Sequence, residues 1–192
     1  KVRSRVNAVD EDLLRKMKQA RVDTIVYGFE SGSQYMLDAF NKKTKVEDNV
    51  RAAQLTRKAG LACLGDMILF YPGESSTTLK ETEDFVRKAK PTAVKYFVLT
   101  PLPTTTVYRE AKDNGTLMGD WNVGDETPWV KTENFDDLHE MQRIAKKMYI
   151  MSLMNPLRIF WLIRFFGKAL VRKPLLTLQM VMKNTIKRKA EY

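Results

Sequence analysis

The sequence predicts an α/β protein whose parallel strands form an open sheet or part of a barrel. Three apolar, β-rich runs, at residues 24–30, 61–69 and 93–100, begin about 30 to 40 residues apart, and a helical pattern follows each of them. This alternation is typical of βα units. Because the crossovers between parallel strands are right-handed, the C-terminal ends of all strands should lie at one edge.

The first helix is expected over residues 10–20, ahead of the first strand. Asp10 is a suitable N-cap, and acidic residues follow it in the first turn. The strand TIVYGFE, residues 24–30, ends in the acid Glu30. A Ser-Gly-Ser turn comes next and leads at once into a short helix over residues 33–40.

The next two βα units follow the same plan. Thr44 and Glu47 have the spacing of a capping box and open a helix that Gly60 ends. After the second strand, the turn YPGESS leads into a helix around residues 77–90. After the third strand, a proline-stiffened loop and a further helix run to Gly115, which completes a unit over residues 1–115.

Length and composition limit what the chain can be. Its 192 residues, 44% of them hydrophobic, suffice for one core-bearing domain with an appendage. The chain begins with Lys1, without a signal segment or an uninterrupted apolar run of about 18 residues, so we expect a cytoplasmic protein and interpret the chain as a piece whose upstream part is missing. The single cysteine, Cys63, excludes a multi-thiolate metal site built from this chain alone.

Unusual residues gather at the edge where the strands end. Glu30 ends the first strand, Asp66 lies near the end of the second, and Thr100 ends the third. Ligands of α/β folds bind at this edge, where two carboxylates could accept hydrogen bonds from ribose hydroxyls or from a ligand ammonium group. Two structural interpretations stay open beside this one: Glu30 could cap the helix that begins near Ser33, and Asp66 could pair with a nearby lysine.

Three stretches carry a family resemblance: VDEDLLRKMKQARVDTIVYGFESGSQYMLDAFNKKT, GDMILFYPGESSTTLKET and VLTPLPTTTVYREAKDNG. In this order and spacing they closely resemble the second half of the radical S-adenosylmethionine (radical SAM) barrel, above all in multidomain members with an upstream cobalamin-binding domain. The resemblance covers residues 1 to about 150. It implies a partial (β/α)6 barrel in which a [4Fe-4S] cluster, held by a three-cysteine motif after the first strand, cleaves SAM reductively to a 5′-deoxyadenosyl radical.

The resemblance also implies roles for individual residues. Glu30, with Ser31 beside it, takes the position whose polar side chain contacts the ribose and methionyl region of SAM, and Asp66 resembles the acid that hydrogen-bonds a ribose hydroxyl. Further positions would line the adenine side, largely through backbone groups. They are Pro72, Gly73, Glu74, Leu99 and Thr100.

The chain departs from the family pattern in three ways. Phe70 stands where such sequences usually have Gly, and Thr104 stands where Pro-Gly-Thr is common, so that either could narrow the SAM pocket. The cysteine motif and the first three strands are not expected in this chain, which places the cluster ligands outside it. We therefore interpret the chain as part of an active parent enzyme, inactive by itself, whose partner is the N-terminal half of the same protein.

Residues 116–134 are expected to form an irregular linker, and a helix should follow over residues 135–154. Trp121 and Trp129 should pack this linker onto the body, with stacking on a substrate as the alternative. His139, the only histidine, lies on an exposed-looking face of the helix and indicates no metal site.

The extension over residues 135–192 is basic at its end. Residues 1–149 carry 24 basic and 22 acidic side chains, whereas residues 150–192 carry 9 and 1. From Leu157 the basic residues fall in one sector of an amphipathic helix. Such a helix can lie at a membrane surface or pack on the body with its basic side in solvent, whereas its wide aliphatic face disfavours nucleic acid.

Two classes of function stay open from the sequence. The first is a piece of a radical SAM enzyme that acts on a hydrophobic or tetrapyrrole-like small molecule, with or without cobalamin. The second is a non-catalytic α/β binding or scaffold module whose tail lies on a membrane. A Cys-x3-Cys-x2-Cys motif encoded upstream of Lys1 would distinguish the first from the second.

Overall fold

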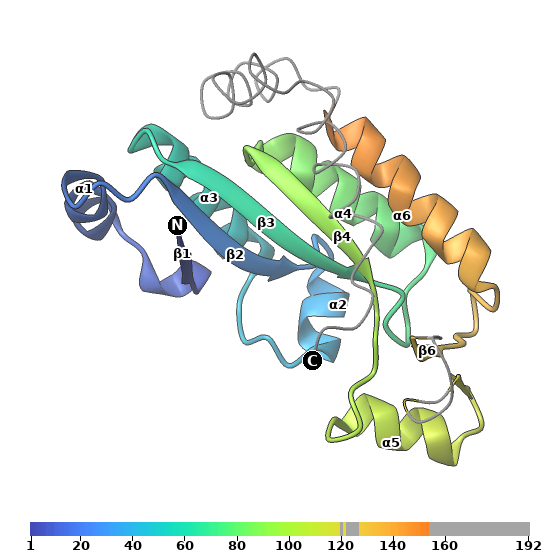
Figure 1. The fold of residues 1–192 in the computed structure, drawn as a ribbon. Coiled ribbons are helices and arrows are strands. Elements are labelled where there is room, and N and C mark those ends of the chain that lie inside the picture. The colour runs from blue at the N-terminus through green and yellow to red at the C-terminus, as the bar shows by residue number, and fades with distance from the viewer. Residues whose placement is uncertain (120, 122–126, 154–192) are drawn as a thin grey trace, which may run out of the picture.

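The computed structural model describes residues 1–119, 121 and 127–153. Its centre is a four-stranded parallel sheet in which the strands lie side by side in sequence order (Figure 1). The strands are β1 (Val2–Ser4), β2 (Thr24–Glu30), β3 (Ala62–Leu69) and β4 (Ala93–Val98). The three strands predicted from the sequence are confirmed, with β4 ending two residues earlier than expected.

The helices follow the strands as the βα pattern predicts. They are α1 (Glu11–Gln19), α2 (Gln34–Ala39), α3 (Val46–Lys58), α4 (Ser76–Ala89), α5 (Thr106–Asp113) and α6 (Leu138–Leu153), with a 3-10 turn η1 (Val6–Ala8) after β1. Helices α3, α4 and α6 cover one face of the sheet (Figure 1). The main core forms between these helices and the strands, because apolar side chains of both layers are buried there.

The two faces of the sheet differ in composition. Along β3, Cys63, Met67 and Leu69 are fully buried under the helices, whereas Leu64 and Asp66 alternate with them on the other face and are half-buried. We call this second face the open face. It is turned towards the viewer in Figure 1. In a closed barrel the face opposite the helices is the interior, so the open face is where a ligand would lie.

Strand β1 was missed by sequence reasoning. It has only three residues, and its Val2 and Arg3 pair in register with Ile25 and Val26 of β2. Three residues are too few for a periodic pattern to be recognised, and the strand is fixed by its neighbour instead. The expectation that all strands before residues 24–30 lie outside the chain is thereby corrected.

The start of α3 differs from the predicted capping box. Lys45 is the N-cap, and its backbone N–H donates to Asp48 Oδ2 at 3.0 Å. Thr44 lies one residue too early and its side chain is buried, so Thr44 and Glu47 do not form the predicted pair. At α1 the prediction is confirmed, since Asp10 accepts from the N–H of Leu13 at 2.8 Å.

The segment after α5 contains regular structure that the sequence did not indicate. Strand β5 (Leu117–Met118) pairs antiparallel with β6 (Trp129–Val130), so the linker is not irregular throughout. Trp121 donates from Nε1 to the carbonyl oxygen of Pro101 at 2.9 Å, which ties the segment to the loop after β4. Both tryptophans thus pack this part onto the body, as expected.

Helix α6 begins at Leu138, three residues later than predicted, and lies against β4. His139 is exposed on it, in agreement with the sequence. Within the described residues, no helix has the length and apolarity needed to cross a membrane. The predicted basic amphipathic helix from Leu157 lies outside the described residues.

Candidate functional site

Glu30 sits at a bulge at the end of β2. The register between β2 and β3 shifts between Gly28 and Glu30, and Glu30 has a φ of 63°. A Cβ placed on Gly28 would lie 2.4 Å from Glu30 Oε1, so the carboxylate folds back over Gly28 on the open face. Lys42 holds it there with an Nζ–Oε1 distance of 2.6 Å. Only a glycine at position 28 leaves this space to the carboxylate.

The turn after Glu30 is fixed to α4. Ser31 Oγ accepts from the N–H of Ser33 at 3.1 Å and hydrogen-bonds Thr82 Oγ1 at 3.1 Å. At Gly32 a Cβ would lie 2.4 Å from Phe85 Cβ and 2.6 Å from Thr82 Cα, so the backbone touches the helix directly. Glu30 does not cap α2, whose N-cap Ser33 makes no side-chain capping bond. The structure therefore disfavours the capping interpretation.

Asn49 supports the same turn from α3. Its side chain is fully buried, and Nδ2 donates to the carbonyl oxygens of Phe29 at 3.1 Å and Ser31 at 3.4 Å. The atoms Asn49 Oδ1 and Ser33 Oγ are also buried, but they have no hydrogen-bond partner within the described part of the chain. Buried polar atoms of this kind remain available for further hydrogen bonds at the end of β2.

Asp66 faces the same space from β3. It is the register partner of Gly28, over which the Glu30 carboxylate lies. Its side chain is 19% exposed and pairs with Arg3 Nη1 at 3.5 Å, while Arg3 itself is 73% exposed. The ion pair that the sequence offered as an alternative thus exists, but with an arginine from β1 instead of a lysine. Such a long contact to an exposed partner is weak and leaves the carboxylate free to accept other donors.

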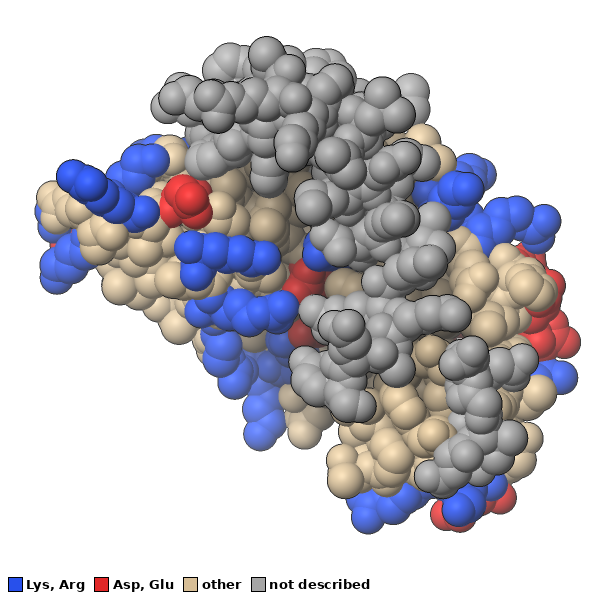
Figure 2. Space-filling model, viewed as in Figure 1, with Lys and Arg blue, Asp and Glu red and all other residues tan. Residues whose placement is uncertain are grey.

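The structure therefore brings Glu30 and Asp66 together on the open face. Figure 2 shows acidic atoms near the middle of this face with Lys and Arg side chains beside them. Each carboxylate has one cationic partner, Lys42 or Arg3, and an ionised carboxylate can accept about four hydrogen bonds. The pair can thus bind hydroxyl or ammonium donors of a ligand without losing the cations that hold it.

Glu74 is placed differently from these two acids. Its side chain is 0% exposed, Oε2 accepts from the N–H of Phe70 at 3.2 Å, and Oε1 accepts from the Thr78 hydroxyl. Burial raises the pKa of Glu74 above its ordinary value, against the effect of these hydrogen bonds. Its backbone N–H donates to Tyr71 O at 2.9 Å, and its carbonyl accepts from Asn134 Nδ2 at 2.9 Å. Glu74 therefore fixes the loop between β3 and α4 from within.

Phe70 does not narrow the pocket in the way the sequence suggested. It has a φ of 66°, the left-handed region that favours Gly, and its buried ring meets that of Phe135 at 4.8 Å in the helical core. The ring thus points away from the open face. The backbone keeps the conformation a glycine would take, and the aromatic side chain is accommodated by the core.

The other predicted residues lie at the same end of the sheet. Pro72, Gly73 and Thr100 are exposed, and Gly73 has a φ of 90°. Leu99 is buried in a second small cluster beside α5, and its N–H donates to Leu69 O at 2.9 Å. Their predicted contact with the adenine side of a cofactor stays a prediction.

Four residues of this region were missed by sequence reasoning: Arg3, Lys42, Asn49 and Lys95. Arg3 and Lys42 lie 63 and 12 residues from the acids they pair with, so no local pattern connects them. For Lys95, a signal existed. It interrupts an apolar strand with a charge, as Asp66 does in β3, and the two are register partners.

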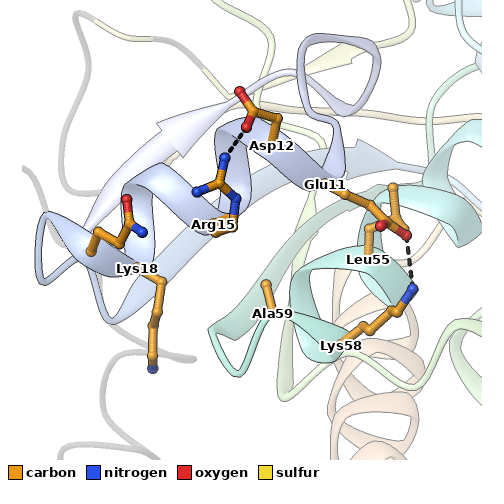
Figure 3. A pocket seen from close by; sticks show the side chains of 8 residues that line it. Glu11, Asp12, Arg15, Lys18, Leu55, Lys58 and Ala59 are labelled. Atoms are coloured by element: carbon orange, nitrogen blue, oxygen red, sulfur yellow. Dashed lines mark hydrogen bonds and ion pairs between the residues drawn. The ribbon is translucent and has the colours of Figure 1, made fainter.

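A hollow lies between α1 and α3, and none of the site residues discussed above lines it (Figure 3). It has a volume of about 490 Å³ and is lined largely by charged side chains of the two helices. Two ion pairs, Arg15 with Asp12 and Lys58 with Glu11, already join the charges that line it. In the described ranges, no three His, Cys, Asp or Glu side chains gather as a possible metal site.

Parallel strands with helices on one face, and two carboxylates at the strand ends on the other, are the arrangement of a segment of an α/β barrel. Residues 1–86, which contain β1, β2 and β3, match the model of the Radical SAM superfamily. This match confirms the resemblance predicted from the sequence over these residues.

Two relatives are similar to the chain over most of its length. An uncharacterized methyltransferase from Pyrococcus horikoshii is 26% identical over 155 residues, 80% of this chain and 34% of that protein. The anaerobic magnesium-protoporphyrin IX monomethyl ester cyclase of Rubrivivax gelatinosus is 28% identical over 135 residues, 70% of this chain and 24% of the cyclase. The chain thus spans between a quarter and about a third of these relatives.

A solved structure agrees in fold. The cobalamin-dependent S-adenosylmethionine radical enzyme OxsB, in its apo form, superposes with a TM-score of 0.60 and 19% sequence identity, over 95% of this chain and 33% of OxsB. At this identity the likeness concerns the fold alone, and it agrees with the prediction of part of a barrel.

Proposed function

We propose that this chain is the second half of the barrel in a longer radical SAM enzyme and that it binds SAM through Glu30 and Asp66. The observation that carries the proposal is their juxtaposition. The two carboxylates come from neighbouring strands and lie together on the face that a closed barrel would turn inwards. Their position at the strand ends is that of ligand-binding groups in α/β barrels.

The residues present fit SAM as a ligand. Its ribose hydroxyls and its ammonium group are hydrogen-bond donors, and carboxylates are the acceptors that bind them most strongly. Each acid has one cationic partner, Lys42 for Glu30 and Arg3 for Asp66, so each keeps further acceptor capacity. Ser31, whose hydroxyl is engaged with Thr82, serves by fixing the turn and not by contacting the cofactor.

The loops at the same edge would bind the adenine side. Pro72 and Gly73 are exposed beside the open end of the sheet, as is Thr100 after β4. The backbone groups of these residues can pair with the edge of a base, whereas Glu74 uses its own N–H, carbonyl and side chain to hold the loop. We therefore assign Glu74 and Leu99 a supporting role at this site.

The residues of this chain do not fit a [4Fe-4S] cluster. Such a cluster needs several thiolates, and the only cysteine, Cys63, is buried on the helical side of β3. We therefore place the cluster ligands outside this chain, in a part of the parent enzyme that would precede Lys1. The chain spans about a third of one similar protein and about a quarter of another, and this difference in length supports a longer parent.

Two further features of the parent are part of the proposal. The name of OxsB, a cobalamin-dependent enzyme, supports an upstream cobalamin-binding domain. The name of the Rubrivivax cyclase, which acts on a magnesium-protoporphyrin ester, supports a hydrophobic, tetrapyrrole-like substrate. A cytoplasmic location with the basic tail at a membrane surface would suit such a substrate.

The test has a genetic and a biochemical part. The sequence upstream of Lys1 should encode Cys-x3-Cys-x2-Cys, and the full-length protein, reconstituted with iron and sulfide without oxygen, should consume SAM once reduced with dithionite. The matched control is the same protein with the three cysteines changed to alanine, which should not consume SAM. An upstream sequence without the motif, or a wild-type protein as inactive as the control, would overturn the proposal and favour a non-catalytic binding module.

A further inference from the structure

Lys95 lies on the open face and forms no ion pair with any other described residue. Its neighbours Val94 and Tyr96 are buried in the helical core, so the alternation of β4 places Lys95 on the opposite side of the sheet. It is half-buried and is the register partner of Asp66. Nevertheless, no ion pair of Lys95 occurs among the described residues, although Asp66 and Glu30 each have one with another cation.

Among the described residues, the acids of this face pair with other cations, Glu30 with Lys42 and Asp66 with Arg3 over 3.5 Å, and the ammonium group of Lys95 forms no ion pair. In the complete barrel of the proposed parent enzyme, the side chain of Lys95 would be enclosed in the interior together with the ligand. An enclosed ammonium group without an anion is strongly unfavourable, so an anionic group should face it in the complete protein.

The surroundings of Lys95 indicate what kind of molecule carries that anion. Phe97, two residues on along β4, lies on the same side of the strand and is 37% exposed, which is unusual for a phenylalanine in a sheet. Leu64 and Ala93, which are register partners, lie on this face as well and are half-buried. The half of the face formed by β3 and β4 is thus apolar around one cation, whereas the half beside β2 carries the two acids.

We propose that Lys95 binds a carboxylate of the substrate while Phe97 contacts the apolar body of the same molecule. This inference rests on the proposed function, which places SAM at Glu30 and Asp66, on the side of β2. An apolar wall does not suit the polar methionyl end of SAM, but it suits an amphipathic molecule with an acidic side chain, for which a lysine supplies a point charge.

The test uses the full-length protein and two porphyrin probes that differ only in whether their two carboxylates are free or methylated. Protoporphyrin IX has two free carboxylates, and its dimethyl ester has none, while the apolar ring is the same. Binding is followed by the change in porphyrin absorption. The wild-type protein should bind the acid about tenfold more tightly than the ester, since a charge-assisted contact is lost in the ester. Lys95→Met should abolish this preference, because it should lower the affinity for the acid and leave the affinity for the ester unchanged.

Two further variants separate the contributions. Phe97→Ala should lower the affinities for the acid and for the ester by the same factor, because the apolar contact does not depend on charge. Lys88→Met, which removes an exposed lysine of α4 on the helical side, is matched in charge and should leave both affinities unchanged. Affinity for SAM should be the same in wild type, Lys95→Met and Phe97→Ala.

The outcomes distinguish this inference from the function on which it rests. If the wild-type protein binds acid and ester equally, or if Lys95→Met retains the preference for the acid, the inference is wrong. The inference is also wrong if Lys95→Met lowers the affinity for SAM instead of the affinity for the acid. If the wild-type protein binds no SAM at all, the proposed function fails, whatever the porphyrins do.

Discussion

Glu30 and Glu74 both follow a buried strand, and both were predicted to lie at a cofactor, but the structure gives them opposite surroundings. Glu30 lies on the open face, holds a single ion pair with Lys42 and keeps unused acceptor capacity. Glu74 is fully buried and is engaged through both carboxylate oxygens, its N–H and its carbonyl. An acid at the end of a strand can therefore serve either a ligand or the loop itself.

The two glutamates have different surroundings because the backbone takes a different direction after each strand. After Glu30 a bulge and a turn keep the carboxylate on the ligand side, over Gly28. After Phe70 the left-handed backbone turns the loop towards α4, and Glu74 reaches back beneath it. Stability should thus depend on Glu74, and ligand affinity on Glu30, and this contrast can be tested in both directions.

The largest effect is expected from Glu74→Ala. The change leaves the Phe70 N–H and the Thr78 hydroxyl buried without their partner, which should lower the free energy of unfolding by about 3 kcal/mol. Urea denaturation of the full-length protein measures it. Asp84→Ala, at an exposed position of α4, is the control and should cost less than about 1 kcal/mol. Equal losses in the two variants would contradict a supporting role for Glu74.

A smaller effect, on affinity, is expected from Gly28→Ala. The added methyl group would meet Glu30 Oε1, so the carboxylate must leave its place over Gly28. SAM affinity should fall by about 1 kcal/mol, whereas stability should change little because only the end of a flexible side chain has to move. In a Glu30→Ala background, Gly28→Ala should have no further effect on affinity. Additive losses in the double variant would show that Glu30 does not lie where the structure places it.

Glu74 should also make stability depend on pH. Burial raises the pKa of Glu74 in the folded state above its ordinary value of 4.5, so the folded protein holds this proton more tightly than the unfolded chain does. The associated stability is fully present below the ordinary value and is lost as the pH rises through the raised pKa. Glu74→Gln cannot titrate, so its unfolding free energy, measured by urea denaturation, should fall less over this window. Parallel curves for the two proteins would contradict the assignment.

The smallest effect is expected from Lys42→Met. The ion pair with Glu30 is partly exposed, and such pairs contribute about 0 to 1 kcal/mol to stability. The unfolding free energy should therefore change by less than about 1 kcal/mol. SAM affinity should fall modestly, because the carboxylate is no longer held over Gly28. A loss of stability as large as that of Glu74→Ala would remove the contrast between the two acids.

Much of the fold could be predicted because its signals are local. The strand over residues 24–30 and the Asp10 cap depend on neighbouring residues and were confirmed. Strand β1 could not be predicted from the sequence, because its three residues form a strand only by pairing with β2. At the site, the juxtaposition of Glu30 and Asp66 followed from the βα pattern, but the burial of Glu74 did not, because it depends on Thr78 and on Asn134 60 residues away.

The most direct test of the account is the affinity for SAM, measured by calorimetric titration of the full-length protein. Glu30→Ala and Asp66→Ala should each weaken binding by about 1 to 3 kcal/mol, which is about 5-fold to 150-fold, while the protein remains folded. Glu74→Gln, whose amide oxygen can still accept from the Phe70 N–H, should bind SAM like the wild type. Unchanged affinity in both Glu30→Ala and Asp66→Ala would contradict the assignment of these two carboxylates to the cofactor.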